Sequence, residues 1–312
     1  MSISSDSLRD TAKHALAGTS MPDMSVSSRA ITLPLSHARA CDPRVAGNKA
    51  ANLARAAVAG LPTLPGFVIT AEACGDIQKL SSLGHLDPDR LSLLQAAWEV
   101  LSHDGARAVV VRSSSWEDAE GSSMAGRFVS VLGVRTWAEF VHAVEGVIAS
   151  GNIIDLGDAP HRVSMAVLVQ PELEAARGGI MFGVDPLDGR RDRFLVSVVD
   201  GGPDRLVGGR EDGVRYRLST RGRTIEGPGR GDKKLLGFRQ RRALANLALD
   251  ASRTFAGPQD IEWAIDGDGK LWLFQSRSVA ASGSEMSGPP LGPGPVAETF
   301  PTQPSPLEED LG

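Results

Sequence analysis

The stretch from Gly257 to Arg277 constrains the fold more than any other part of the chain. It reads GPQDIEWAIDGDGKLWLFQSR, so two runs of alternating apolar residues flank the turn sequence DGDG at positions 266–269. Asp-Gly and Gly-Asp steps supply the positive φ angles that a tight turn between antiparallel strands requires. The pattern predicts a β-hairpin with a two-residue loop.

A hairpin of this kind sorts its side chains onto two faces, because a strand repeats every two residues. The predicted apolar face, which packs in the core, consists of Ile261, Trp263, Ile265, Trp272 and Phe274. The predicted polar face consists of Asp260, Glu262, Gln275 and Arg277. Two carboxylates and an amide oxygen suit Mg²⁺, and an adjacent arginine suits a phosphate. A solvated outer face with a surface ion pair is an equally good interpretation of this stretch alone.

The composition is typical of a soluble globular protein and argues against two classes of partner. The 312 residues are 41% hydrophobic and 23% charged, with a net charge of -5 and a pI of about 5.7. This charge disfavours nucleic acid and acidic membrane surfaces as the main partner. No apolar run approaches the length of a membrane span, and the two cysteines, Cys41 and Cys74, fit a reducing compartment. We therefore expect a cytoplasmic protein without membrane association.

The chain divides into three regions by composition. Residues 1–30 are rich in Ser, Asp and Met without an apolar period, which predicts a disordered N-terminal arm. From Ala281 the composition changes to Pro, Gly, Ser and acidic residues, which predicts a flexible tail over 281–312. The region 31–280 is interpreted as the folded domain, with two lobes of roughly 31–160 and 161–280.

Three upstream segments contribute further candidate site residues. The segment GNKAANL at 47–53 places Lys49 in a glycine-containing loop where a helix begins, so its ammonium and the helix amides could bind one anion. A buried-strand pattern delivers Arg112 to the start of a Ser/Gly-rich loop over 113–126, of the kind that often forms a lid. Gln170 closes another strand, whose backbone edge could recognise an adenine. Taken singly, each segment is also typical of ordinary surface or a connecting loop.

Five motifs in order resemble the N-terminal ATP-binding domain of pyruvate phosphate dikinase, phosphoenolpyruvate synthase and rifampin phosphotransferase. The resemblance runs from about Val45 to Val279. The motifs are GNKAANL, GLP followed by PGFVIT, VVRSSS, GIMF followed by DP, and GPQDIEW followed by QSR. This family resemblance implies an α/β (α+β) fold of the ATP-grasp-like type, with ATP held between two lobes.

The resemblance also implies a role for each candidate residue. Lys49 and Arg112 would contact the phosphates of ATP, and Arg277 would meet the transferred phosphoryl group. The implied Mg²⁺ ligands are Glu262 and Gln275, with Asp260 nearby. The implied activity is ATP-dependent phosphoryl transfer of the dikinase type, in which positioning and charge supply most of the catalysis.

The sequence departs from the family pattern in two loops. The family's Gly-Gly is Gly47-Asn48 here, and its Gly-Leu-Gly-Glu loop appears as GGPD at 201–204. In addition, full-length relatives continue into a swivelling domain whose histidine carries the phosphoryl group, and then into a substrate domain. We expect both to be supplied by a separate protein, and His37, although it stands in a similar Ser-His-Ala-Arg context, is interpreted as a surface residue. The alternatives are a non-catalytic nucleotide-binding regulator, a truncated remnant of a dikinase, and an ATP-grasp ligase.

Overall fold

The computed structural model describes residues 30–116, 129–151, 164–185, 189–207, 209, 211–229, 231 and 233–279. The chain divides into two units, Met1–Ala30 and Ile31–Gly312, and every described helix and strand lies in the second. The predicted tail, nearly all of the predicted arm and most of the predicted Ser/Gly lid lie outside the described residues.

A five-stranded sheet with the order β1-β2-β5-β3-β4 forms the first half of the folded unit. Its strands are antiparallel: β1 Thr32–Pro34, β2 Phe67–Ile69, β3 Val109–Ser115, β4 Ser130–Val134 and β5 Met165–Pro171. Every position of β5 is buried, as suits a strand between two neighbours. The predicted lobe boundary near residue 160 is therefore wrong, because β5 pairs within this sheet and the chain leaves it only after Pro171.

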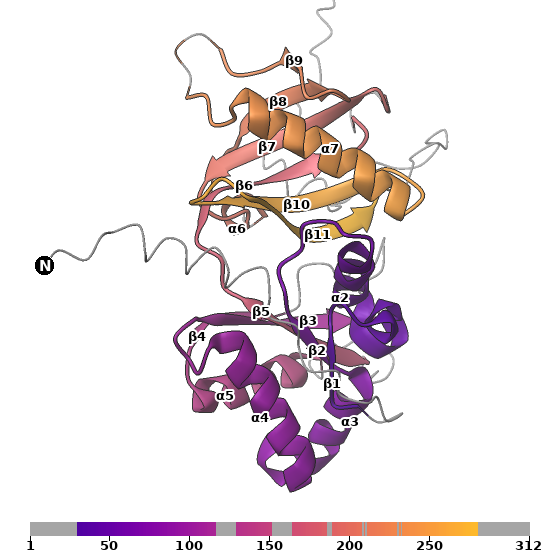
Figure 1. Cartoon of the computed structure of the whole chain (residues 1–312), viewed down its shortest axis with the longest axis vertical. Helices are drawn as coiled ribbons and strands as arrows, with labels where there is room; N and C mark the ends of the chain where they lie inside the picture. The colour runs from indigo at the N-terminus through magenta and orange to yellow at the C-terminus, as the bar shows by residue number, and fades with distance from the viewer. Residues whose placement is uncertain are drawn as a thin grey trace, which may run out of the picture. The chain divides into compact units, whose positions relative to one another are not determined.

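Helices α3 (Ala71–Leu80), α4 (Pro88–Ser102) and α5 (Trp137–Ser150) lie together on one side of this sheet (Figure 1). Two short 3-10 helices, η1 (Ala38–Cys41) and η2 (Leu83–His85), connect the elements. The predicted start of α5 is confirmed as a capping box, since the Glu139 amide donates to Thr136 Oγ1 and the Thr136 amide donates to Glu139 Oε2. None of the helices in the described ranges is long and apolar enough to span a membrane.

A six-stranded antiparallel sheet with the order β11-β10-β6-β7-β8-β9 forms the second half. Its strands are β6 Ala175–Phe182, β7 Arg193–Asp200, β8 Val214–Ser219, β9 Thr224–Glu226, β10 Gln259–Asp266 and β11 Leu271–Ser278. The long helix α7 (Phe238–Thr254) runs across this sheet, and the short helix α6 (Asp204–Val207) follows β7 (Figure 1). The predicted α/β (α+β) fold class is confirmed.

Helix α2 (Pro43–Val58) connects the two sheets. It packs on β3 and β5 of the first sheet and also contacts β11 of the second. The Asn52 side-chain amide donates to the Ser276 carbonyl at 3.1 Å, and the Leu273 amide donates to the Pro62 carbonyl at 2.7 Å. These bonds tie the segment that carries Lys49 to the strand that carries Gln275.

Gly47 interrupts α2 in a conformation that only glycine adopts readily. Its φ of 71° and ψ of 163° lie outside the region open to residues with a Cβ atom. A Cβ at this position would stand 2.1 Å from the Ser114 carbonyl oxygen, so glycine is also required by the close approach of β3. The helix therefore begins again at Asn48, which places Lys49 in a first turn as predicted.

We expect Gly47→Ala to destabilise the protein by on the order of 2–4 kcal/mol, because it combines backbone strain with a steric overlap. Gly146 provides the matched control, since it lies inside α5 with no atom within 4 Å of an added Cβ. Gly146→Ala should raise stability by roughly 0.5–1 kcal/mol. Urea unfolding measures both, and equal effects of the two substitutions would contradict the assigned strain.

Candidate functional site

The predicted hairpin of β10 and β11 forms, but its loop has three residues rather than two. The Asp266 amide donates to the Lys270 carbonyl, which leaves Gly267, Asp268 and Gly269 in the loop, with Gly269 at a φ of 84°. The Asp266 carboxylate accepts hydrogen bonds from the amides of Asp268 and Lys270, at 3.1 and 2.8 Å. These bonds stabilise the longer turn, and the turn sequence alone does not distinguish it from the shorter one.

A β-bulge compensates for the extra loop residue. The register shifts between Glu262 and Trp263, because Phe274 has no partner on β10. Beyond the bulge, Glu262 pairs with Gln275 and Asp260 pairs with Arg277. The extra loop residue and the bulge shift the register by one residue each and in opposite senses. The four polar residues therefore form two facing pairs, as predicted.

The bulge also changes the predicted apolar face, and the assignment of Trp272 to that face is wrong. Trp272 pairs with Ala264, which alternates with Glu262 along β10. Its indole Nε1 donates to the Asp266 carboxylate at 2.8 Å. Trp272 therefore shares the face of Glu262, near the turn.

The assignment of Phe274 to the apolar face is wrong as well. Its ring centroid lies 5.8 Å from the Cζ atom of Arg112, a cation–π contact with a residue of the polar site. Leu273, rather than Phe274, lies opposite Trp263, and the side chains of Leu273 and Trp263 are both fully buried. The physical cause is the bulge, which breaks the alternation of faces along β11.

Arg277 lies close to the other three polar residues of the hairpin. The Gln275 amide oxygen accepts from Nε and Nη2 of Arg277 in the amide orientation that satisfies both side chains. Nη2 of Arg277 lies 4.0 Å from Oε1 of Glu262. Asp260 is the cross-strand partner of Arg277. The polar face is thus a charge cluster rather than a solvated surface.

Asp260 is the most perturbed acid of this cluster. Burial raises its pKa to about 7, the neighbouring Glu262 carboxylate raises it further, and Arg277 opposes both. Its Oδ1 is buried and has no hydrogen-bond partner among the described residues. A buried carboxylate with an unsatisfied oxygen beside a second carboxylate favours a bound cation or a proton.

Arg112 brings the first sheet to this cluster. Burial lowers the pKa of its guanidinium, against the attraction of the Glu262 and Asp204 carboxylates. Its Nε is buried without a hydrogen-bond partner in the described part of the chain. Asp204 lies in the GGPD loop, which differs from the family pattern, and it therefore belongs to the electrostatic environment of the site. Sequence inspection marked that loop only as a departure and assigned Asp204 no role.

Lys49 lies next to the strand end that carries Arg112. Its Nζ donates to the Ser113 carbonyl at 3.5 Å, and the side chain of Asn48 donates to the Trp116 carbonyl. The Ala50 amide donates to the hydroxyl of Ser114 at 3.0 Å. That amide is therefore satisfied within the protein, and the predicted contact of Lys49 with an anion stays a prediction.

Gln170 supports the backbone with its side chain. Its Nε2 donates to the Leu64 carbonyl at 3.2 Å, and only 5% of the residue is exposed. The backbone of Gln170 faces Val110 of β3. The predicted contact of this strand end with an adenine stays a prediction.

The oxygen atoms of the cluster fit Mg²⁺ in kind and in number. Among the described residues, no three His, Cys, Asp or Glu side chains lie close enough together to hold a metal ion by themselves. The two carboxylates of Asp260 and Glu262 and the amide oxygen of Gln275 are the set that Mg²⁺ takes when phosphate and water complete its coordination. The unsatisfied Oδ1 of Asp260 and the guanidinium held among these oxygens both show a site arranged for positive charge.

His37 has a structural role. Its Nδ1 accepts a hydrogen bond from the Arg39 amide at 3.1 Å and so caps the short helix η1. The side chain is only partly exposed. The interpretation of His37 as an ordinary residue outside the site agrees with this position.

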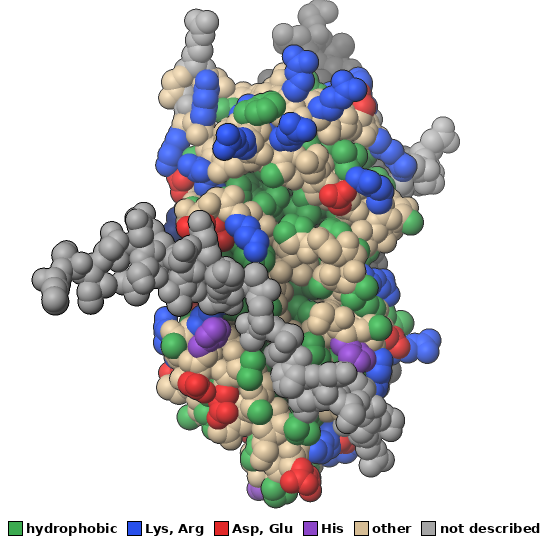
Figure 2. Space-filling view, viewed as in Figure 1, with side chains coloured by type: hydrophobic (Ala, Val, Ile, Leu, Met, Phe, Trp, Pro, Cys, Tyr) green, Lys and Arg blue, Asp and Glu red, His purple; other side chains and the backbone are tan. Residues whose placement is uncertain are grey.

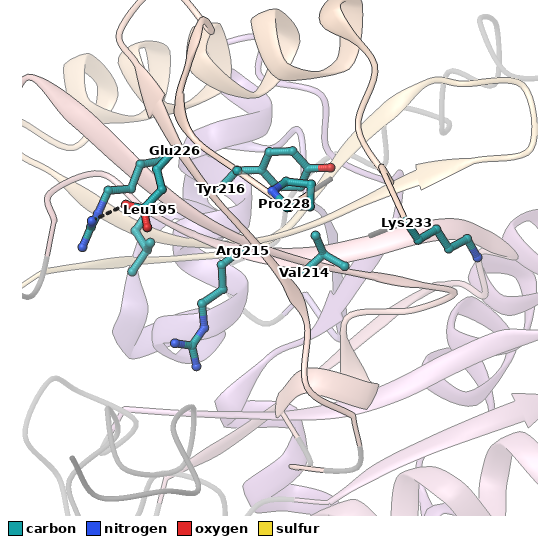
Figure 3. A pocket seen from close by; sticks show the side chains of 10 residues that line it. Leu195, Val214, Arg215, Tyr216, Glu226, Pro228 and Lys233 are labelled. Carbon is teal, nitrogen blue, oxygen red and sulfur yellow. Dashed lines mark hydrogen bonds and ion pairs between the residues drawn. The ribbon is translucent and has the colours of Figure 1, made fainter. Parts of the chain in front are cut away.

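A separate cavity of about 520 Å³ lies over β8 and the segment that follows β9 (Figure 3). Figure 2 shows Lys and Arg side chains gathered over β8, β9 and α7 in this part of the molecule. Arg217, on the cavity wall, is paired with buried Asp185 at 3.0 Å and with Glu226, and Lys233 is paired with Asp200. These pairs offset the charges of Arg217 and Lys233. None of the predicted site residues lines the cavity.

We expect the stability of the protein to depend on the protonation of Asp260. A carboxyl whose pKa is raised on folding stabilises the native state below its unfolded pKa of about 4, and this contribution is lost as the pH rises through about 7. Asp260→Asn should therefore be more stable than the wild type at pH 8, without metal or nucleotide, and the difference should shrink towards pH 4.5.

Urea unfolding at the two pH values measures this difference. Asp268→Asn, on the exposed turn of the same hairpin, is the control and should change stability by no more than about 0.5 kcal/mol. A stability gain for Asp260→Asn that is equal at both pH values would refute the raised pKa.

Comparison with known families gives one match that covers most of the chain. The family model described as "Pyruvate phosphate dikinase, AMP/ATP-binding domain" matches residues 77–242 and 230–291. These ranges include Arg112, Gln170 and the whole hairpin. Lys49 lies before them.

Curated relatives have low identity and are much longer. A probable phosphoenolpyruvate synthase of Methanothermobacter thermautotrophicus is 25% identical to this chain, in a match that covers 78% of this chain and 45% of the relative. The prodigiosin synthesizing transferase PigC of Serratia marcescens is 28% identical, in a match that covers 80% of this chain and 33% of the relative. The chain thus spans less than half the length of these relatives.

Solved structures show partial similarity. The D-alanine-D-alanine ligase of Coxiella burnetii matches with 12% identity and a TM-score of 0.37, over 74% of this chain and 47% of the ligase. The biotin carboxylase domain of a Hydrogenobacter thermophilus 2-oxoglutarate carboxylase, in complex with MgADP, matches with 13% identity and a TM-score of 0.37, over 73% and 39%. At these TM-scores the similarities support no conclusion about function.

Proposed function

Because the chain belongs to the family of pyruvate phosphate dikinase AMP/ATP-binding domains, we propose that it binds ATP with Mg²⁺ and transfers a phosphoryl group from it. One observation carries the proposal. Asp260, Glu262, Gln275 and Arg277 share one face of a rigid hairpin, and Arg112 of the other sheet contacts Phe274 of the same hairpin and is attracted by the Glu262 carboxylate.

The cationic residues take the phosphate roles. Arg112 and Arg277 can each bind phosphate oxygens with two N–H groups, and Lys49 adds a point charge. Since the Nε of Arg112 lacks a partner in the described chain, a phosphate oxygen would supply its missing hydrogen bond. Gln170 marks the strand end at which the adenine would bind.

The oxygen ligands take the metal role. Glu262 and Gln275 would hold the cation, with Asp260 beside them, and Mg²⁺ supplies charge neutralisation for the phosphates when it is bound. Burial of Asp260 and Gln275 excludes water and strengthens the electrostatic interactions of the site. These residues bind and orient, and no side chain of the cluster needs to form a covalent bond with the substrate.

The phosphoryl acceptor belongs to a domain outside residues 1–312. We propose that the acceptor is a histidine on such a domain, supplied by a separate protein. The family resemblance implies this role, because a histidine of the swivelling domain carries the phosphoryl group in the family. The relatives, which are more than twice as long as the matched region, leave room for such domains. The rival proposal is a nucleotide-binding regulator without turnover, and it differs in predicting binding but no transfer.

The first test is calorimetric titration with ATP. The wild type should bind ATP more tightly with Mg²⁺ than without, and Glu262→Gln should remove most of that difference, because it replaces a carboxylate ligand with a neutral amide. Lys49→Ala should weaken ATP binding by roughly 10-fold, the effect of losing about 1.4 kcal/mol. Lys79→Ala, which removes an exposed lysine on α3, should leave both affinities unchanged. Equal ATP affinity with and without Mg²⁺ in the wild type would count against the site.

The second test is transfer. With γ-³²P- and β-³²P-labelled ATP, the chain alone should show only slow hydrolysis, and label should move to an acid-labile phosphohistidine when a histidine-bearing domain from a relative is added. Arg112→Ala should abolish transfer, whereas His37→Ala should not affect it. Binding of ATP without any transfer to a panel of such domains would favour the regulator.

A further inference from the structure

Arg277 lies beside the oxygen atoms that would hold a divalent cation, in contact with Gln275 and 4.0 Å from Glu262. We propose that its guanidinium is an internal counter-cation, which holds the metal position in the nucleotide-free protein and leaves it when phosphates arrive. The inference rests on the proposed function for the identity of the metal and the nucleotide. It assigns to Arg277 a role before phosphoryl transfer, in addition to its proposed contact with the phosphoryl group.

The contacts of Arg277 coincide with the candidate metal ligands. The Gln275 oxygen accepts two of its N–H groups, Glu262 lies 4.0 Å from Nη2, and Asp260 is its cross-strand partner. The guanidinium thus engages Gln275 and lies near Glu262, and Asp260 stands opposite it on β10. A cation that bound these oxygens would have to take the place of those interactions.

Charge makes the two occupants exclude one another. A guanidinium and a divalent cation repel, and the repulsion is strong where the surroundings are buried. Two carboxylates close together also need a positive charge near them, because like charges repel each other. Arg277 supplies that charge when no metal is bound.

Exposure shows which partner can move. The side chain of Arg277 is 40% exposed, whereas that of Glu262 is 20% exposed and Gln275 is buried. The oxygens are therefore held by the packed hairpin, and the arginine has a route to solvent. A phosphate chain beside Arg112 offers it bidentate hydrogen bonds of greater strength than the amide oxygen of Gln275.

This arrangement couples metal binding to nucleotide binding. Without nucleotide, a metal ion competes with Arg277 and binds weakly. With nucleotide, the phosphates attract Arg277 and contribute their own oxygens, so the metal binds tightly. By thermodynamic linkage, metal and nucleotide then raise each other's affinity by the same factor.

The experiment measures Mn²⁺ binding to the full chain without nucleotide, by electron paramagnetic resonance of free Mn²⁺. Arg277→Met removes the charge and adds no oxygen ligand, and it should bind Mn²⁺ at least 10-fold more tightly than the wild type. Arg277→Lys keeps a cation and should remain close to the wild type. Arg253→Met makes the same change at an exposed arginine of α7 and should also have no effect. Adding Glu262→Gln to Arg277→Met should remove the gained affinity and so locate the metal.

The nucleotide arm repeats the titration with ADP. ADP should raise the Mn²⁺ affinity of the wild type, and this enhancement should be several-fold smaller in Arg277→Met. Unchanged or weaker Mn²⁺ binding by folded Arg277→Met, judged by circular dichroism and melting temperature, would overturn the inference. If the wild type binds no nucleotide while Arg277→Met gains Mn²⁺ affinity, the proposed function fails and the counter-cation role stands.

Discussion

The site depends on the register between β10 and β11. Because strand side chains alternate, a slip of one residue would move Glu262 or Gln275 to the core face and separate the two. The hairpin departs twice from regular geometry, once in a three-residue loop and once at Phe274, and each departure shifts the register by one. Because the two shifts compensate, the polar residues stay together. The bulge also turns the ring of Phe274 towards Arg112.

The close approach at Gly47 completes the arrangement from the other sheet. Only a residue without a Cβ lets α2 come so near β3, and that contact places Lys49 against the carbonyl of Ser113, next to Arg112. The same helix reaches β11 through Asn52. One backbone contact of a few ångströms thus sets the relation between the lysine, the arginine and the hairpin.

The sequence predicted that the candidate residues of the hairpin lie together, because their types and their spacing carry that signal. The alternation along β10 put Asp260 and Glu262 on one face, and Thr136 with Glu139 marked a helix start. Prediction from the sequence failed where non-local packing decides. The membership of β5 in the first sheet follows from pairing with β2 and β3, which lie far away in the chain, and residue composition does not encode it. The bulge at Phe274 accompanies the three-residue turn, which the turn sequence alone does not distinguish from a two-residue turn. The sequence did not indicate a role for Asp204 either, because its carboxylate acts on the pKa of Arg112 only in the folded chain.

The bond between Asn52 and Ser276 spans 224 positions of the chain. During synthesis, α2 and much of the first sheet leave the ribosome long before β11 is made, so this contact is among the last to form. Until then β10 has one paired edge only, and an unpaired strand edge is prone to association with other chains. The strand that completes the polar face therefore also covers this edge of β10.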